Sequence, residues 1–548
     1  MAKASLCESD SRSAIAVANV ERHTPPGPIK MDSVAHEDQE KAGIIQSFRN
    51  YPQAVGFSMV LSLCIVMEAY DTSLIGNFYG LAQFRRRFGV QLENGEFQLT
   101  WTWQSALQNG TQVGQMVGLL ISGIVAEQYG YKKTLLGALA LNAVFVLVLF
   151  FAQNIGYLLA GGILCGLPWG AFQTLTTTYA ADVTPMALRP MMTTYTNMCW
   201  VVGQFIGTGG PPRAAPSPGR LGVAHPLRPP VGFSRPPIVV GVALAPESPT
   251  WLVRKGRLDE ARRALRRLAG ASVSDAQLDL NMAVIAHTND MEKHNEEGTS
   301  YVDCFRGTNR RRTAIASLTW VGQVTCGMWF GSNLTYFLQQ AGLDSKGSFD
   351  FALGTSAMAI LGTAISWLLL PHVGRRTLYV GGLAIMLAVL VAVGGLGVPN
   401  PTPSLGLASG VLLMVFVFIY DVSVGPVTYC LVAEIPSTRL RIKTVALARN
   451  AFLLVSVGAN FLGPPVLNPS AWNLRGKGGF VAAGFCFCEL VWAFFCLPEP
   501  KGRSPAELEV LFEQSVSARK FAETKPHVFT RVVREKKDGL VVNMAEEA

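Results

Sequence analysis

Two carboxylic acids lie within the first long apolar stretch of the sequence. Glu68 and Asp71 both fall in the run from 54 to 80. An ionisable side chain inside a bilayer costs several kcal/mol, so its presence at that depth indicates a functional site. A carboxyl group there can alternate between its protonated and ionised forms as the surrounding cavity opens. The alternative is that one of the two acids only pairs with a buried base.

A second pair of ionisable side chains occurs in two later apolar runs. Asp421 lies in the run from 405 to 433, and Arg449 lies in the run from 445 to 466. Neither charge can remain unpaired in lipid. We therefore expect Asp421 and Arg449 to face the protein interior and to pair, directly or through water. Such a pair serves structure as readily as function.

The elements that carry these residues are segments able to cross a membrane. The chain has 548 residues, of which 49% are hydrophobic and only 15% charged. A spanning helix needs about 20 predominantly apolar residues. We therefore predict an all-α membrane protein of twelve transmembrane helices, the sixth too short to span. The predicted segments are 54–80, 98–123, 134–152, 156–180, 191–209, 238–246, 314–338, 352–371, 377–397, 405–433, 445–466 and 479–498.

The distribution of charge predicts how the chain is oriented. The net charge is +9, but the basic residues lie in short loops between apolar runs rather than on one soluble face, which argues against a nucleic-acid partner. If the spans alternate, the basic loops and both termini fall on one side, which the positive-inside rule makes the cytoplasm. The first fifty residues are polar and resemble a disordered tail without a leader peptide.

The two halves of the chain repeat. Asp182 and Arg189 recur as Glu434 and Arg441 with an offset of 252 (434 − 182 and 441 − 189), and Glu247 recurs at the same offset (499 − 247 = 252). A basic turn at 132–134 recurs at 375–377. We therefore predict two six-helix bundles with a substrate cavity between them near mid-membrane.

Charged residues beside the predicted helix ends can form breakable ion pairs on the cytoplasmic side. Alternating access requires such pairs, which would hold the inner side closed while the protein faces outward. The alternative for the basic residues is ordinary positive-inside anchoring. The candidates are Glu127, Lys132, Lys133, Asp182, Arg189, Glu247, Arg375, Arg376, Glu434, Arg441 and Glu499.

Several motifs, in order, resemble the sugar porters of the major facilitator superfamily, specifically the fungal maltose and α-glucoside permeases (general α-glucoside:H⁺ symporters). They include MEAYDTSLIGNFYG, ILCGLPWGAFQTLTTTYAADV, APESPTWLVRKGRLDEARRALRRL, YDVSVGPVTYCLVAEIPSTRLR and LPEPKGRSPAELEVLF. The resemblance covers roughly residues 45 to 515. It implies a major facilitator fold and proton-coupled transport of a sugar, an α-glucoside such as maltose, by alternating access.

The resemblance also implies roles for individual residues. Asp71 matches the proton-coupling acid, with Glu68 beside it. Sugar recognition needs amides for hydroxyl groups and an aromatic face for the ring. Gln204, Gln323 and Tyr429 match the positions that provide these groups, and Gln104 and Asn333 are plausible additions. The alternative for each is an interhelical hydrogen bond. One departure is Gly162, which stands where several proton-coupled relatives carry arginine.

One segment conflicts with a membrane span. Residues 210–237 are rich in proline and arginine and contain no acid, where the family has the end of span five and most of span six. Such a stretch cannot satisfy its backbone hydrogen bonds in lipid. The distance from Asp182 to Glu247 nevertheless equals that from Glu434 to Glu499, 65 residues in each half (247 − 182 and 499 − 434). This pattern favours a local reading-frame error over a genuine insertion.

These features define the expected organisation. The predicted parts are a disordered tail (1–50), an N-terminal bundle (51–246), a helical cytoplasmic linker (247–313), a C-terminal bundle (314–498) and a C-terminal tail (499–548). The expected partners are a sugar, a proton and the lipid bilayer, and we expect a monomer in the plasma membrane.

Other functions are less compatible with the sequence. No constellation of catalytic residues, phosphate loop or metal ligands is present, so an enzyme is not expected and neither is a cofactor. The ten cysteines are scattered and fit small buried hydrophobes. Two alternatives remain open, a sugar sensor with a transporter fold and a nonfunctional permease remnant.

Overall fold

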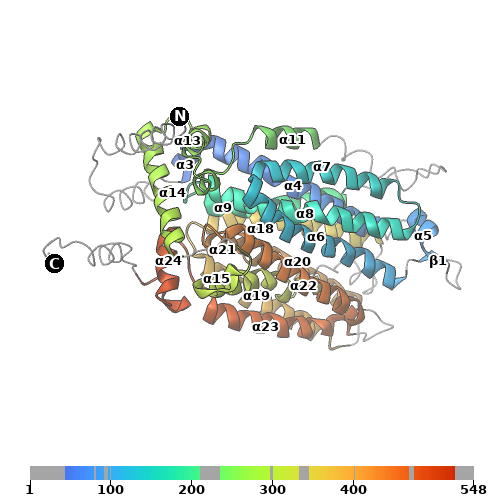
Figure 1. The fold of residues 1–548 in the computed structure, drawn as a ribbon. Coiled ribbons are helices and arrows are strands. Elements are labelled where there is room, and N and C mark those ends of the chain that lie inside the picture. Colours follow the sequence, from blue (N-terminus) through green and yellow to red (C-terminus); the bar gives the residue numbers. More distant parts are fainter. Residues whose placement is uncertain are drawn as a thin grey trace, which may run out of the picture.

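The computed structural model describes residues 44–78, 82–91, 97–98, 100–209, 235–295, 300–331, 345–399, 402–467 and 474–524. Its long helices run side by side in one elongated bundle (Figure 1). Eight segments of the described residues are long and apolar enough to cross a membrane. Within the described ranges, β structure is confined to one short antiparallel pair, β1 (Val90–Gln91) with β2 (Phe97–Gln98).

The first half of the chain supplies helices at all six predicted span positions. They are α4 (Pro52–Phe78), α6 (Trp101–Tyr129), α7 (Tyr131–Phe150), α8 (Ile155–Val183), α9 (Arg189–Gly209) and α11 (Arg235–Leu244). The short α3 (Ile44–Asn50) precedes them, and α5 (Ala82–Phe88) follows α4. Helix α6 packs along α8, α4 along α9, and α11 against α4 and α7.

The second half supplies the remaining span positions. They are α15 (Gly307–Thr325) with α16 (Met328–Gly331), α18 (Ser345–Leu369), α19 (Arg375–Leu396), α20 (Pro403–Val422) with α21 (Val424–Glu434), α22 (Arg441–Leu467) and α23 (Gly478–Cys496). Helix α15 packs along α22, and α19 packs against α23. A single turn, η2 (Arg475–Lys477), precedes α23. The helix order is that of the predicted major facilitator fold.

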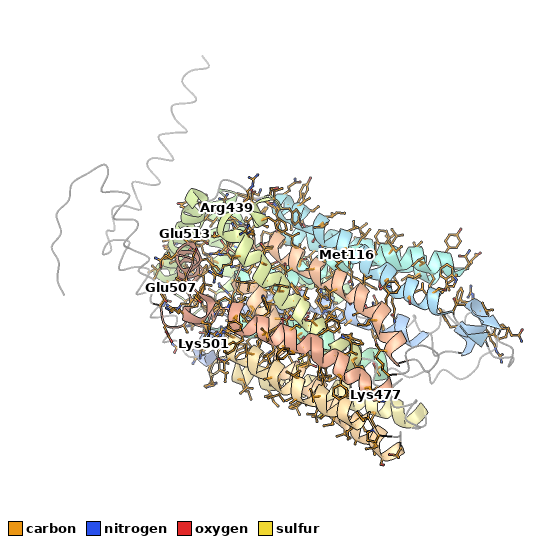
Figure 2. All side chains as sticks on the ribbon, turned by 90° about the horizontal axis from the view of Figure 1, so that it is seen from below. Met116, Arg439, Lys477, Lys501, Glu507 and Glu513 are labelled. Atoms are coloured by element: carbon orange, nitrogen blue, oxygen red, sulfur yellow. The ribbon has the colours of Figure 1, made fainter. Side chains whose placement is uncertain are left out.

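The remaining helices gather at one end of the bundle, which we call the linker end (Figure 1). They are α12 (Pro249–Arg254), α13 (Leu258–Leu268), α14 (Asp275–Asn295), η1 (Asp303–Phe305), α24 (Pro505–Glu513) and η3 (Ala518–Lys520). In Figure 2 the charged residues Arg439, Lys501, Glu507 and Glu513 lie toward this end, and Lys477 lies toward the opposite end. The linker predicted from the sequence is therefore helical.

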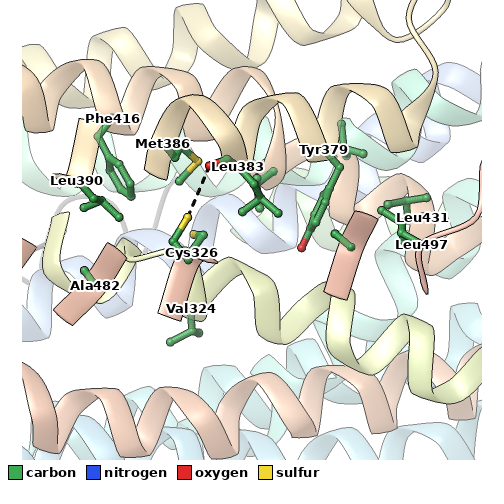
Figure 3. Packing of buried hydrophobic residues seen from close by; sticks show 14 of the residues in the cluster. Val324, Cys326, Tyr379, Leu383, Met386, Leu390, Phe416, Leu431, Ala482 and Leu497 are labelled. Carbon is green, nitrogen blue, oxygen red and sulfur yellow. Dashed lines mark hydrogen bonds between the residues drawn. The ribbon is translucent and has the colours of Figure 1, made fainter. Parts of the chain in front are cut away.

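Each half of the chain has its own apolar core. In the second half Leu383, Met386 and Leu390 of α19 and Phe416 of α20 are fully buried and pack together (Figure 3). In the first half, glycines allow close helix packing. A Cβ atom at Gly114 of α6, or at Gly166 or Gly170 of α8, would collide with the backbone of the other helix. Small residues at such crossings are typical of membrane helices.

Two predicted spans are interrupted. The segment predicted as 314–338 begins earlier, at Gly307, and α15 ends at Thr325, where Gly327 follows with a φ of 103°. Glycine adopts this left-handed conformation without steric cost. The segment predicted as 405–433 divides into α20 and α21 at Ser423, whose ψ is −87°. The hydrophobicity of the sequence did not predict either interruption.

The predicted tails are partly structured. Residues 44–50, assigned to a disordered tail, form α3, and residues 1–43 lie outside the described ranges. In the C-terminal tail, α24 begins with a capping box between Ser504 and Glu507. Glu509 of α24 forms a buried 2.8 Å ion pair with Arg312 of α15. The start of the C-terminal tail is therefore bound to the second half of the chain.

The segment expected to be aberrant falls largely outside the described residues, which exclude 210–234. The helix that follows, α11, has ten residues. Ten residues span about 15 Å, half of the hydrocarbon thickness. The described part of the sixth segment is thus shorter than a span, and that the whole segment is too short to span stays a prediction.

Candidate functional site

Glu68 lies at the centre of a network that connects the two halves of the chain. This α4 residue is fully buried, and its Oε1 accepts hydrogen bonds from Gln115 Nε2 of α6, at 3.0 Å, and from Gln173 Nε2 of α8. Gln173 in turn accepts, through its Oε1, a hydrogen bond from Arg449 Nε of α22. One glutamine side chain therefore hydrogen-bonds both a carboxyl group of the first half and a guanidinium group of the second.

Aromatic rings surround the Arg449 guanidinium. Its central carbon lies 3.9 Å from the centroid of the Phe452 ring and 5.3 Å from that of Trp320. Trp320 makes an edge contact with Tyr429, with ring centroids 5.6 Å apart. Cation–π contacts stabilise a desolvated cation by about 2 kcal/mol or more. The arginine is therefore accommodated in the membrane interior by rings together with one amide.

Asp421 has other partners than the one predicted. Its Oδ1 accepts a 3.0 Å hydrogen bond from Asn197 Nδ2 of α9, and the same Nδ2 lies 3.1 Å from Thr363 Oγ1 of α18. Arg449 instead donates to Gln173. The described ion pairs do not join Asp421 directly to Arg449, because each group hydrogen-bonds an amide of the opposite half; pairing through water stays a prediction.

The structure brings the two acids of α4 into different surroundings. Asp71 is one turn beyond Glu68 and is half-buried, whereas Glu68 is fully buried. Glu68 Oε2 has no hydrogen-bond partner within the described part of the chain. The deeper of the two acids is thus the one connected to Arg449.

The predicted sugar-binding residues fall into three groups. Gln323 of α15 is buried and donates a 3.0 Å hydrogen bond to the Gly425 carbonyl of α21, and Tyr429 is buried beside Trp320. Gln204 of α9 is exposed. Gln104 is in the first turn of α6, with its side chain outside the described part, and Asn333 also lies outside it. Tyr429 therefore lies beside a ring that contacts Arg449, and Gln323 contacts the same helix, α21.

Two ion pairs join the two halves at the linker end. Arg441 Nη1, at the start of α22, lies 2.5 Å from Asp182 Oδ1, at the end of α8. Lys443 of α22 pairs with Glu127 of α6. The Arg441 and Asp182 side chains are only 3% and 2% exposed. Of the predicted gating residues, Asp182, Arg441 and Glu127 thus form contacts that must break if the halves separate at this end.

Other predicted gating residues bind within their own half. Glu247 accepts hydrogen bonds from the Tyr131 and Lys132 N–H groups at 2.9 and 3.2 Å, at the start of α7. Glu499 likewise accepts from the Arg375 and Arg376 N–H groups, both at 3.0 Å, at the start of α19. A carboxylate is stabilised at a helix N-terminus. These equivalent caps confirm the repeat seen in the sequence.

Burial affects the ionisation of one of these caps. It raises the pKa of the Glu247 carboxyl, because the loss of solvent outweighs the opposing effect of hydrogen bonds from Ser248, Tyr131 and Lys132 backbone N–H groups.

The remaining gating candidates have varied surroundings. Arg375 of α19 pairs with Glu434 of α21 at 3.2 Å, inside the second half. Arg376 donates to the Phe494 carbonyl, and Lys133 is exposed. Arg189 is close to Arg441 and Glu434, and the described ion pairs do not include it. The sequence therefore identified most of these charged residues, but it missed Lys443 and did not show which pairs cross between the halves.

Sequence reasoning missed several polar residues of the interface. Gln115, Gln173 and Asn197 were not singled out, because amides inside apolar runs are common interhelical contacts. The repeat carried a signal for one of them. Asn197 precedes Arg449 by 252 residues (449 − 197), the offset that already related Arg189 to Arg441. Further contacts between α6 and α22 are the Gln112–Ser456 and Asn109–Asn460 hydrogen bonds, at 3.3 and 3.0 Å.

The amino-acid sequence is similar to known permeases over most of its length. Residues 57–512 match the protein family described as "Sugar (and other) transporter". An alpha-glucosides permease of Saccharomyces cerevisiae is 39% identical over 502 residues, which cover 90% of this chain and 83% of the relative. A maltose permease of Saccharomyces cerevisiae is 37% identical over 527 residues, covering 94% and 86%.

Solved structures share the fold. The proton:xylose symporter XylE bound to 6-bromo-6-deoxy-D-glucose superposes with a TM-score of 0.70 at 18% sequence identity, covering 84% of this chain and 99% of that one. An inward-open conformation of XylE from E. coli gives a TM-score of 0.54 at 19% identity, covering 84% and 99%. The fold of this chain is therefore that of the major facilitator superfamily.

Proposed function

The chain belongs to the sugar transporter family of multi-pass membrane proteins, and we propose that it carries an α-glucoside together with a proton by alternating access. The observation that carries this proposal is the Glu68 network. A buried acid of the first half connects through Gln173 to Arg449 of the second half, so a change of charge on α4 acts directly on the contact between the halves. The substrate class is inferred from the alpha-glucosides and maltose permeases that resemble the chain over most of its length.

Asp71 is the proposed proton carrier, with Glu68 as the acid that transmits its charge state to Arg449. The two carboxyl groups lie one turn apart on α4, where two negative charges in a membrane interior repel each other strongly. Binding of one proton removes this repulsion. A proton taken up from one side and released to the other thus links the charge of α4 to the arrangement of the halves.

Sugar recognition is assigned to Gln204, Gln323 and Tyr429, with Gln104 and Asn333 as further members. Gln323 is positioned to exchange partners, because its amide now donates to a backbone carbonyl and can donate to a sugar hydroxyl instead. Tyr429 supplies an aromatic face beside Trp320. The same groups suit a disaccharide or a monosaccharide.

The linker end is proposed to face the cytoplasm, with both termini on that side and the protein in the plasma membrane as a monomer. In this conformation the Asp182–Arg441 and Glu127–Lys443 pairs close that end. The remaining gating candidates support them by fixing the helix ends: Lys132, Lys133, Arg189, Glu247, Arg375, Arg376, Glu434 and Glu499.

Uptake and exchange distinguish coupled transport from its alternatives. The full-length chain is expressed in yeast cells that lack α-glucoside uptake, and [¹⁴C]maltose accumulation is measured at pH 5 with and without a protonophore. We expect accumulation that the protonophore abolishes. Accumulation insensitive to the protonophore would contradict proton coupling. Absence of both accumulation and sugar exchange in purified, correctly folded protein would favour a sensor or a permease remnant.

A further inference from the structure

A second buried acid connects the two halves of the chain, separate from the Glu68 network. Asp421 of α20 is 3% exposed, and the partner that donates to it, Asn197 of α9, is 5% exposed. Thr363 of α18 is fully buried beside them, with its hydroxyl 3.1 Å from the Asn197 amide nitrogen. Helix α9 belongs to the first half, whereas α18 and α20 belong to the second. The contact must therefore break or rearrange if these helices separate.

Among the described residues, no basic side chain forms an ion pair with Asp421. The titratable groups that face it are the hydroxyls of Tyr420 and Tyr429, and the described ion pairs do not include it. A carboxylate in the membrane interior needs strong hydrogen bonds when it is ionised. The Asn197 amide is the donor from the opposite half that meets this need.

The internal repeat relates this contact to the Arg449 network. Asn197 and Arg449 are separated by the repeat offset of 252 residues (449 − 197). Asn197 of the first half donates to an acid of the second, and Arg449 of the second half donates to Gln173 of the first. The side chains at equivalent positions of the two halves thus each donate a hydrogen bond to the opposite half. A rocking motion of one half against the other therefore changes both contacts.

We propose that Asn197 and Asp421 form a latch inside the membrane that stabilises the conformation closed at the linker end, and that protonation of Asp421 weakens it. Asp421 is thus a positioning residue for transport rather than a substrate-binding one, an assignment that rests on the proposed alternating access. An ionised carboxylate accepts a stronger hydrogen bond than a protonated carboxyl group does. Acidic conditions therefore favour opening of the linker end.

The test measures the conformation directly, in purified full-length protein without sugar. Cys7, Cys488 and Cys496 are first replaced by serine. Spin labels are then attached to two introduced cysteines, Tyr129→Cys at the end of α6 and His372→Cys before α19, where both original side chains are exposed. The distance between the labels reports the separation of the halves at the linker end. The readout is the ratio of closed to open molecules. We expect Asn197→Ala to lower this ratio about 3- to 20-fold, which is the change that corresponds to the free energy of one interhelical hydrogen bond in a membrane.

Two further variants separate the latch from a merely structural role. In a background of Glu68→Gln and Asp71→Asn, the closed fraction should still fall as the pH is lowered. Adding Asp421→Asn should reduce this dependence, while the ion pairs of the linker end are present in both proteins. Combining Asn197→Asp with Asp421→Asn exchanges acid and amide, and should restore a closed fraction near that of the parent protein. The matched control is Asn142→Ala, which removes a buried α7 amide that donates to the Met67 sulfur within the first half.

The outcomes decide the proposal independently of transport. An unchanged ratio in Asn197→Ala, or a pH dependence of the same size with and without Asp421→Asn, would overturn it. An equal shift in Asn142→Ala would also overturn it, because the effect would then reflect general destabilisation. Since no sugar or proton gradient is used, a protein that failed to transport sugar would still give either result.

Discussion

Replacing Arg441 with methionine should shift the protein strongly toward a conformation open at the linker end. The Arg441–Asp182 pair is 2.5 Å long, nearly inaccessible to solvent and formed between the two halves. Methionine keeps the apolar stem of the side chain and removes the charge. The cost therefore falls on the closed conformation, where Asp182 loses its cation.

The magnitude follows from what remains around Asp182. Breaking a buried ion pair by removing one partner costs about 3–5 kcal/mol. Asp182 keeps hydrogen bonds from the Tyr131 and Ser248 hydroxyls, each at 2.9 Å, which places the cost at the lower end. A cost of about 3 kcal/mol corresponds to a roughly 100-fold change in the ratio of closed to open molecules.

The spin-label pair at Tyr129 and His372 measures this ratio, and Arg312→Met provides the control. Arg312 and Glu509 form an ion pair of similar burial, 2% and 4% exposed, but it connects α15 to α24 rather than to the first half. Arg312→Met should lower thermal stability and leave the ratio unchanged. An unchanged ratio in Arg441→Met, or equal shifts in both variants, would refute the assignment of Asp182–Arg441 as a latch.

Three further outcomes are expected. Asp71→Asn should abolish proton-driven accumulation while sugar exchange down a gradient survives, because an amide cannot cycle its charge; accumulation at the original level in a radiolabel uptake assay would contradict this. Gln323→Ala should weaken apparent sugar affinity several-fold, since each lost hydrogen bond contributes about 0.5–1.5 kcal/mol, and unchanged affinity for every transported sugar would place the site elsewhere. Restoring the alternative reading frame over residues 210–237 should encode an apolar span and raise surface expression measured with a C-terminal fluorescent tag; a frame that encodes nothing apolar would make the segment a genuine loop.

The fold was largely predictable because its signals are periodic and long. The length of the apolar segments identified the spans. The offset of 252 residues identified the repeat of the two halves, in which Glu247 and Glu499 cap equivalent helices. The break after α15 was not predictable from hydrophobicity, because it depends on the backbone conformation of Gly327. The first described helix, α3, was likewise not predicted, because it belongs to a stretch that is polar as a whole.

The candidate site was predicted in composition but not in pairing. The sequence identified Glu68, Asp421 and Arg449 as costly charges in lipid, yet it paired Asp421 with Arg449. Amides supplied the partners instead, through Asn197 and Gln173. Neutral amides do not appear in the pattern of charges along the sequence. Only the three-dimensional structure shows which helix each amide contacts. For the same reason the sequence did not predict that the Asp182–Arg441 pair joins the two halves whereas the Arg375–Glu434 pair lies within one half.

Coupling of sugar and proton movement is tested most directly in proteoliposomes that contain the purified full-length chain and a pH-sensitive dye in the lumen. Maltose and other α-glucosides are added outside without an imposed pH gradient, with valinomycin and potassium to hold the membrane potential at zero. We predict that a transported sugar acidifies the lumen, and that Asp71→Asn abolishes this signal while radiolabelled sugar still exchanges. Entry of sugar into the lumen without any change in luminal pH would contradict proton-coupled transport.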